Sequence, residues 1–244
     1  MECKITNQII LALVFLLTFL LICIILKAIF FGSTNFQWGS FTDWISSLST
    51  LGTFAVAYAA YKKAPEWMAQ KHYDIVSKVI EEAVYEDLRK LSSFSNQYRN
   101  HMLHTSKILR SCLNSKGALP SDIKETLDKV ESLLIEFFNL SYSIQNRLKA
   151  IPRYNYVITP YTVTITETIK RIADRYNSLQ TQFELAASEV PISLYESEAV
   201  INKLMKEIFD IQLEVIELNN NLNNFIRSIY ADNKSIAEFI AIKK

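Results

Sequence analysis

The feature that most constrains the fold is a hydrophobic repeat near the C-terminus, in which apolar side chains recur at alternate steps of three and four residues. The repeat consists of Ile201, Leu204, Ile208, Ile211, Val215, Leu218, Leu222, Phe225 and Ile229. This spacing places all of them on one face of a helix and gives a heptad seam of about four repeats. An apolar seam of this length needs cover, so the helix is expected to pack in a bundle or to offer the seam to a partner.

Two upstream segments carry the same spacing. One seam consists of Ile165, Ile169, Ile172, Tyr176, Leu179, Phe183 and Ala186, and the other of Ile123, Leu127, Val130, Leu134, Phe137, Ile144 and Leu148. A less regular helix is expected from about Pro65 to Leu113. The expected breaks lie at residues 115–121, with Ser121 as an N-cap, at Pro152, at Thr159 and Pro160, and at Val190 and Pro191. These helices predict an antiparallel four-helix bundle over residues 64–231 and a tail, 232–244, that is a short accessory helix or a mobile end.

The N-terminal part is dominated by apolar length. No charged side chain lies between Ile5 and Leu26, and a helix of about 20 such residues is long enough to cross a bilayer. A secretory signal peptide is the alternative, but signal cores are shorter and no small-residue cleavage pattern follows Phe31. The run therefore predicts a first membrane span over about 7–29.

A second uncharged run extends from Trp44 to Tyr61, between Asp43 and the pair Lys62 and Lys63. Its hydroxyl residues weaken the insertion signal, so the alternative is an amphipathic or buried helix that stays outside the membrane. We expect a second span over about 43–62, with Asp43 capping the helix start. Residues 1–63 would then form a transmembrane hairpin, and the whole chain an all-α protein.

Lysines concentrate after the second run, which by the positive-inside rule predicts a multi-pass protein of the bacterial inner membrane with both termini in the cytoplasm. Cys3, Cys23 and Cys112 are too few and too scattered for an extracellular disulfide framework. The lipid bilayer is the first expected partner.

Composition speaks against most enzymatic sites. The chain holds 26 Lys and Arg against 25 Asp and Glu, so it offers no general basic surface, and no direct nucleic-acid binding is expected. Its four glycines are not spaced as phosphate loops. His101 and His104 lack the converging acid that a metal site needs. We therefore expect no catalytic residue, no metal site and no cofactor.

One face of the second run carries small and hydroxylated side chains, which let membrane helices approach closely. This candidate pore or helix-packing stripe consists of Ser46, Ser49, Thr50, Thr53, Ala57 and Ala60. It could pack against the first span within one hairpin, or between protomers of a homo-oligomer and line a polar path.

Residues 38–44 contain a membrane-interface motif made of Trp38, Gly39, Phe41, Asp43 and Trp44. It resembles the W-G-x-F-x-D element that begins the second span of many small bacterial two-span proteins, several of them linked to phage defence. The layout as a whole resembles the membrane effectors of retron defence systems. That resemblance implies an effector held inactive with a reverse transcriptase and its RNA-linked DNA, and released on infection to damage the inner membrane.

Three functions follow as hypotheses. The first is the inner-membrane effector of an anti-phage, abortive-infection system, which permeabilises the membrane once a restraining partner lets it go. The second is a non-toxic, membrane-anchored helical adaptor or signalling protein that recruits a cytoplasmic partner. The third is an accessory subunit of a channel or transporter, although the absence of charge within either span argues against proton-coupled transport.

Overall fold

The computed structural model describes residues 2–29 and 40–243. For residues 2–12, 28, 29 and 41 it describes the backbone and not the side chain. The chain divides into two compact units, Met1–Pro65 and Glu66–Lys244. Helices make up most of the described residues, and the only sheet among them has two short strands. The predicted all-α class therefore holds in its coarse form.

The first unit contains α1 (Glu2–Ile29) and the beginning of α2 (Phe41–Ile80). Asp43 does act at the start of α2, although as the third residue of a reciprocal cap. Its carboxylate accepts hydrogen bonds from the backbone N–H and the hydroxyl of Ser40, at 2.7 and 2.8 Å. The Asp43 N–H donates back to the Ser40 hydroxyl at 3.2 Å, so two free backbone donors are satisfied together. These bonds lower the pKa of the Asp43 carboxyl.

The predicted location in the bacterial inner membrane is wrong for the part of the chain that the structure describes. Within residues 2–29 and 40–243, no helix is both long enough and apolar enough to cross a bilayer. In α2, serines and threonines interrupt the apolar run, and Lys62 and Lys63 follow in the same helix. The prediction of a multi-pass membrane protein is therefore wrong for the described residues.

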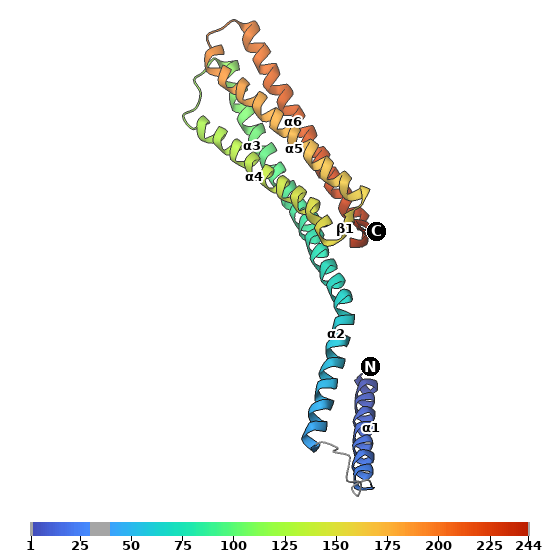
Figure 1. Cartoon of the computed structure of the whole chain (residues 1–244). Coiled ribbons are helices and arrows are strands. Elements are labelled where there is room, and N and C mark those ends of the chain that lie inside the picture. The colour runs from blue at the N-terminus through green and yellow to red at the C-terminus, as the bar shows by residue number, and fades with distance from the viewer. Residues whose placement is uncertain (1, 30–39, 244) are drawn as a thin grey trace. The chain divides into compact units, whose positions relative to one another are not determined.

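The second unit contains the helical bundle, and Figure 1 shows its four long helices running side by side. They are α3 (Leu88–Ser115), α4 (Ile123–Ala150), α5 (Pro160–Ser193) and α6 (Glu198–Asp232). α3 packs against α4 and α6, and α5 packs against the same two helices, which closes a four-membered ring. The predicted helical bundle is confirmed.

Several helix ends differ from the expected positions. α4 is preceded by Asp122 as its N-cap residue, one position after Ser121, because a turn occupies the residues before it. α5 begins at Pro160 behind an extended Thr159, as expected. It then continues through Pro191 to Ser193, so Pro191 does not separate α5 from α6. The break lies at residues 194–197, and Ser197 precedes α6 in an extended conformation.

The seam of α6 shifts part of the way along the helix. Its N-terminal members are buried as predicted, but beyond Val215 the buried positions are Asn219, Leu222, Ile226 and Ile229. Leu218 and Phe225 are only partly buried and pack at the edge of the core. A straight α-helix has 3.6 residues per turn and drifts from a 3.5-residue repeat, so an extra step of four residues restores the register. That step places an asparagine in the core.

The expected long helix before residue 113 is not uniform. Between α2 and α3 the chain forms a π-helical turn, η1 (Glu81–Asp87). The hydroxyl of Tyr230 donates to the carbonyls of Val84 and Tyr85, at 3.2 and 3.0 Å, and thereby satisfies acceptors in this turn. Asp87 is buried at the end of η1 and pairs with Arg147 of α4. The local change of helix type is thus fixed from two sides of the bundle.

The tail is neither a simple helix nor a free end. After the short η3 (Ile236–Glu238), strand β2 (Ile240–Ile242) pairs antiparallel with β1 (Tyr156–Ile158), with Val157 opposite Ala241. β1 follows η2 (Ile151–Tyr154), in the connection between α4 and α5. Phe239 is buried against the bundle. The expectation that the tail would be a short accessory helix or a mobile end was therefore wrong, and the β-branched residues at 157–158 favour the strand with which the tail pairs.

Candidate binding groove

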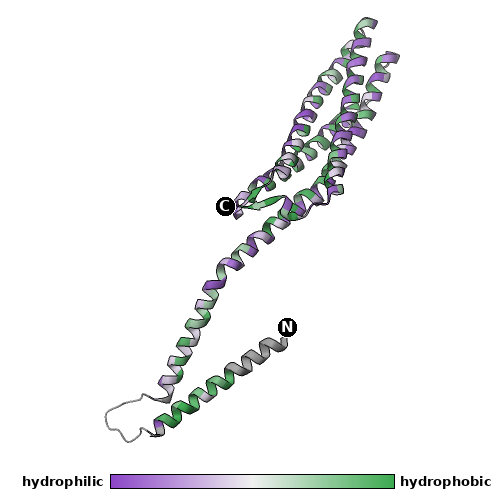
Figure 2. Ribbon diagram, turned by 90° about the vertical axis from the view of Figure 1, so that its right-hand side faces the viewer, coloured by the Kyte–Doolittle hydropathy of each residue, from purple (hydrophilic) through white to green (hydrophobic). Residues whose placement is uncertain are grey.

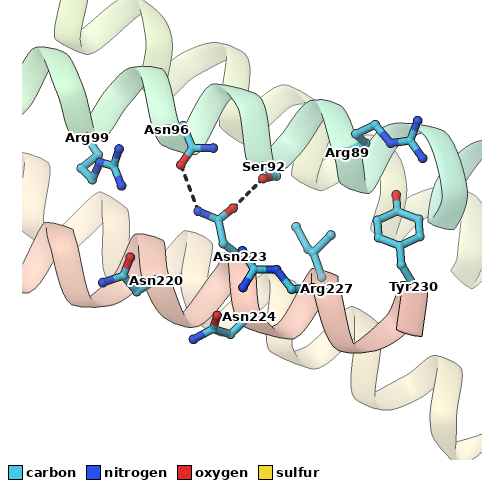
Figure 3. A pocket seen from close by; sticks show the side chains of 10 residues that line it. Arg89, Ser92, Asn96, Arg99, Asn220, Asn223, Asn224, Arg227 and Tyr230 are labelled. Carbon is cyan, nitrogen blue, oxygen red and sulfur yellow. Dashed lines mark hydrogen bonds between the residues drawn. The ribbon is translucent and has the colours of Figure 1, made fainter. Parts of the chain in front are cut away.

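A polar groove of about 680 Å³ lies between α3 and α6, and Figure 3 shows the side chains that line it. α3 contributes two arginines, a serine and an asparagine, and α6 contributes three asparagines, an arginine, a tyrosine and one isoleucine. These residues are Arg89, Ser92, Asn96, Arg99, Asn220, Asn223, Asn224, Ile226, Arg227 and Tyr230. None of them is acidic, so the groove carries a positive charge although the charges of the whole chain nearly cancel.

Asn223 organises the floor of this α3–α6 groove. Its side-chain oxygen accepts a hydrogen bond from the Ser92 hydroxyl, and its amide donates to the oxygen of Asn96 at 2.9 Å and to that of Asn219 at 3.2 Å. The two bonds that reach across to α3 are drawn in Figure 3. Asn223 is partly buried and Asn219 is fully buried, and a buried amide is costly unless it is paired, so this network fixes the separation and the register of α3 and α6.

Behind the floor, Asn219 links the groove to the core. Its amide donates to Ser95 at 2.8 Å, and Ser95 is in turn within 2.7 Å of the Tyr176 hydroxyl on α5. The Tyr176 ring meets those of Tyr98 and Phe137 edge to face, with centroids 5.2 and 5.0 Å away. Burial raises the pKa of Tyr176 to about 12, so its hydroxyl stays protonated over the physiological range.

The arginines of the groove have neutral neighbours. Arg99 donates to the side-chain oxygen of Asn219 at 2.8 Å and to that of Asn100 at 3.0 Å. The Arg89 guanidinium lies over the Tyr230 ring, 5.5 Å from its centroid. Arg227 is exposed on α6. Within the described residues, no ion pair neutralises any of these three arginines. The groove therefore concentrates positive charge, which suits an anionic ligand.

The membrane-interface motif falls only partly within the described residues. Trp38 and Gly39 lie outside them. Phe41 is the first residue of α2, Asp43 makes the cap described above, and Trp44 is exposed one residue later. The structure thus supports a helix-starting role for Asp43, and the motif as a whole stays a prediction.

The small-residue stripe of α2 is exposed along its whole length, from Ser46 to Ala60. The hydroxyl of Thr50 donates to the Ser46 carbonyl and that of Thr53 to the Ser49 carbonyl, each at 2.9 Å. These hydroxyls therefore satisfy carbonyls of their own helix. Among the described residues of the first unit nothing covers the stripe, whose remaining members are Ala57 and Ala60.

The candidate partner-binding seam is occupied by the rest of the bundle. Seven of its nine members are buried, namely Ile201, Leu204, Ile208, Ile211, Val215, Leu222 and Ile229. Leu218 and Phe225 are half-buried. A partner could reach the seam only by opening the four-helix ring, so the closed bundle offers its polar groove instead.

Sequence reasoning missed the groove, although a signal for it was present. Five asparagines fall within residues 219–224, an unusual density inside a helix, where asparagine has a modest propensity. The arginines that complete the site lie more than a hundred residues upstream on α3, apart from Arg227. Only the pairing of α3 with α6 reveals that they share one surface.

Among the side chains that the structure describes, no three His, Cys, Asp or Glu converge as metal ligands. The chain matches no known family model, no curated protein and no solved structure. The resemblance to retron effectors accordingly stays a prediction, and the groove is the feature from which function is argued.

Proposed function

We propose that this protein is a non-enzymatic helical adaptor, whose bundle recruits a protein partner through the α3–α6 groove. The effector hypothesis depends on a membrane location that the structure contradicts. The adaptor hypothesis also assumed a membrane anchor, but recruitment of a partner by the bundle does not require that anchor. The observation that carries the proposal is that several polar side chains lining the groove make no hydrogen bond or ion pair with other described residues of the chain.

The bundle supplies a rigid base for such a surface. Asn223 and Asn219 tie α6 to α3, and the buried rings of Tyr98 and Tyr176 hold α5 behind them. Binding residues on a preorganised scaffold lose little conformational entropy when a ligand arrives. A groove of this size accommodates a segment of polypeptide.

Site-specific photo-crosslinking tests the proposal. A photoreactive amino acid replaces Asn224 in the groove of the full chain, and a matched variant carries it at Glu136, an exposed position on α4, which packs with α3 and α5. We expect the Asn224 variant to form a discrete crosslinked product in its own host, identified by mass spectrometry and recovered again when the identified partner is tagged. The same products from both positions, or none from Asn224, would contradict the proposal.

A further inference from the structure

Three side chains in the groove have hydrogen-bonding groups to spare. Asn220, Asn224 and Arg227 are exposed on α6, and no hydrogen bond or ion pair within the described part of the chain uses their side chains. They recur at i, i+4 and i+7, so they form one row along the helix. Figure 3 shows all three on α6, with Asn224 at the edge of that helix farther from α3.

The chemistry of this row matches that of a peptide backbone. A primary amide offers one carbonyl acceptor and two N–H donors, the same groups that a peptide unit presents. Asn220 and Asn224 can therefore pair with main-chain groups of an extended segment, whatever its side chains. From Asn220 to Arg227 the helix rises about 10 Å, a length that about three residues of extended chain cover.

The charges of the groove select the side chains of that segment. Arg89 and Arg99 lie ten positions apart on α3, roughly 15 Å along the helix axis, and Arg227 faces them from α6. Since no lining residue is acidic, a neutral or basic segment would leave these guanidinium groups without anions. Arginine pairs with carboxylates through two parallel hydrogen bonds, which adds geometric selectivity to the charge.

We propose that the α3–α6 groove binds an acidic segment of the partner protein in extended conformation. The segment's backbone pairs with Asn220 and Asn224, and its carboxylates pair with Arg89, Arg99 and Arg227. This inference rests on the proposed adaptor function and names the chemistry of the partner.

The aromatic content of the groove disfavours nucleic acid as the occupant. Single strands bind by stacking bases on exposed aromatic rings. Tyr230 is the aromatic residue among those lining the groove, and the Arg89 guanidinium already lies over its ring. Its hydroxyl is engaged with the carbonyls of η1. Bases would therefore find no free ring on which to stack.

Fluorescence anisotropy with the full chain tests the inference. The probe is a labelled peptide of about ten residues that alternates glutamate and serine, and its control carries glutamine in place of each glutamate. We expect the glutamate peptide to bind and the glutamine peptide to bind at least about tenfold more weakly, because one lost charge-assisted pair already changes affinity by about that factor. Methylation of alternate peptide nitrogens should also weaken binding, since it removes the donors that Asn220 and Asn224 would use.

Variants locate the binding. Arg227→Gln should weaken binding of the glutamate peptide about tenfold, and Asn224→Ala should weaken it less. Lys206→Gln removes one positive charge from an exposed position of the same helix outside the groove and should leave affinity unchanged. All three positions are exposed, so circular dichroism should show intact folding.

Equal binding of the two peptides would overturn the inference, as would equal losses in Arg227→Gln and Lys206→Gln. Displacement of the glutamate peptide by a single-stranded oligonucleotide of about equal charge, in a manner that depends on Arg227, would also overturn it in favour of nucleic acid. The proposed function fails separately. If the crosslink at Asn224 captures a partner while no acidic peptide binds, the adaptor function stands and the acidic segment is rejected.

Discussion

α1 and α6 are both long helices rich in large aliphatic residues, yet their side chains end in opposite surroundings. The side chains described in α1 are mostly exposed, including Leu17 and Leu21, whereas the seam of α6 is buried by its two neighbouring helices, α3 and α5. Figure 2 shows the contrast, because the described part of α1 is coloured mostly as hydrophobic while polar and apolar residues alternate along the bundle helices. The spacing of apolar residues, more than their number, therefore directs a helix into a core.

The same contrast between buried and exposed apolar residues exists within α6. Leu222 is fully buried and Leu213 is 49% exposed, and both lie on α6. Leu222→Ala should lower the free energy of unfolding by about 2–5 kcal/mol, since it removes buried methyl groups and leaves a cavity. Leu213→Ala should change it by less than about 0.5 kcal/mol. Urea unfolding followed by circular dichroism measures both, and equal losses would refute the role of the buried seam.

The next effect concerns the buried polar network of Tyr176, Ser95 and Asn219, for which the described part of α1 has no counterpart. The pKa of Tyr176 is about 12 in the folded chain against an ordinary value of 10, because burial favours the neutral hydroxyl. Below pH 10 the Tyr176 hydroxyl is neutral in both the folded and the unfolded chain, so its burial does not make stability depend on pH there. As the pH rises from 10 towards 12, the unfolded chain ionises first, so the free energy of unfolding should fall by on the order of 3 kcal/mol.

Urea unfolding at about pH 8 and about pH 11.5 checks this dependence. In Tyr176→Phe the fall should be smaller, with a remainder from Tyr98, whose pKa burial also raises. The variant should be less stable than the parent at the lower pH, because it loses the contact with Ser95. An unchanged fall in Tyr176→Phe would show that other groups control the alkaline limit.

The smallest effect tests α1 directly. Leu17 is 61% exposed, so Leu17→Ala should change the free energy of unfolding of the bundle by less than about 0.5 kcal/mol. The measurement is the urea transition of the full chain, with Leu222→Ala as the matched change in the core. A loss of similar size in the two variants would break the comparison, because it would mean that α1 is packed in solution.

The bundle could be predicted from the sequence because its information is local. Steps of three and four residues locate the faces of α4, α5 and α6, and Pro160 marks where α5 begins. The position of Asn219 in the core could not be predicted from the same spacing, since the drift of a real helix against the heptad decides it. The uniformly apolar run around Leu17 led to the opposite kind of error, because it predicted a membrane span that is not found among the described residues.

The groove was hidden for a different reason. Its arginines and asparagines are ordinary surface residues along each helix, and only the pairing of α3 with α6 makes them neighbours. The strand pairing between residues 156–158 and 240–242 was hidden in the same way, because three-residue strands carry almost no periodic signal. Contacts between distant segments are what single-sequence patterns report least well.

The strand pairing of the tail also sets an order of events during biosynthesis. β1 leaves the ribosome before β2, because α5 and α6 lie between the two strands in the chain. Until β2 has emerged, β1 lacks the strand with which it pairs in the folded protein, and the pocket that Phe239 later fills stays open. Synthesis of residues 239–242 therefore closes this end of the bundle, so a chain that stopped before them would contain its four long helices without this strand pairing.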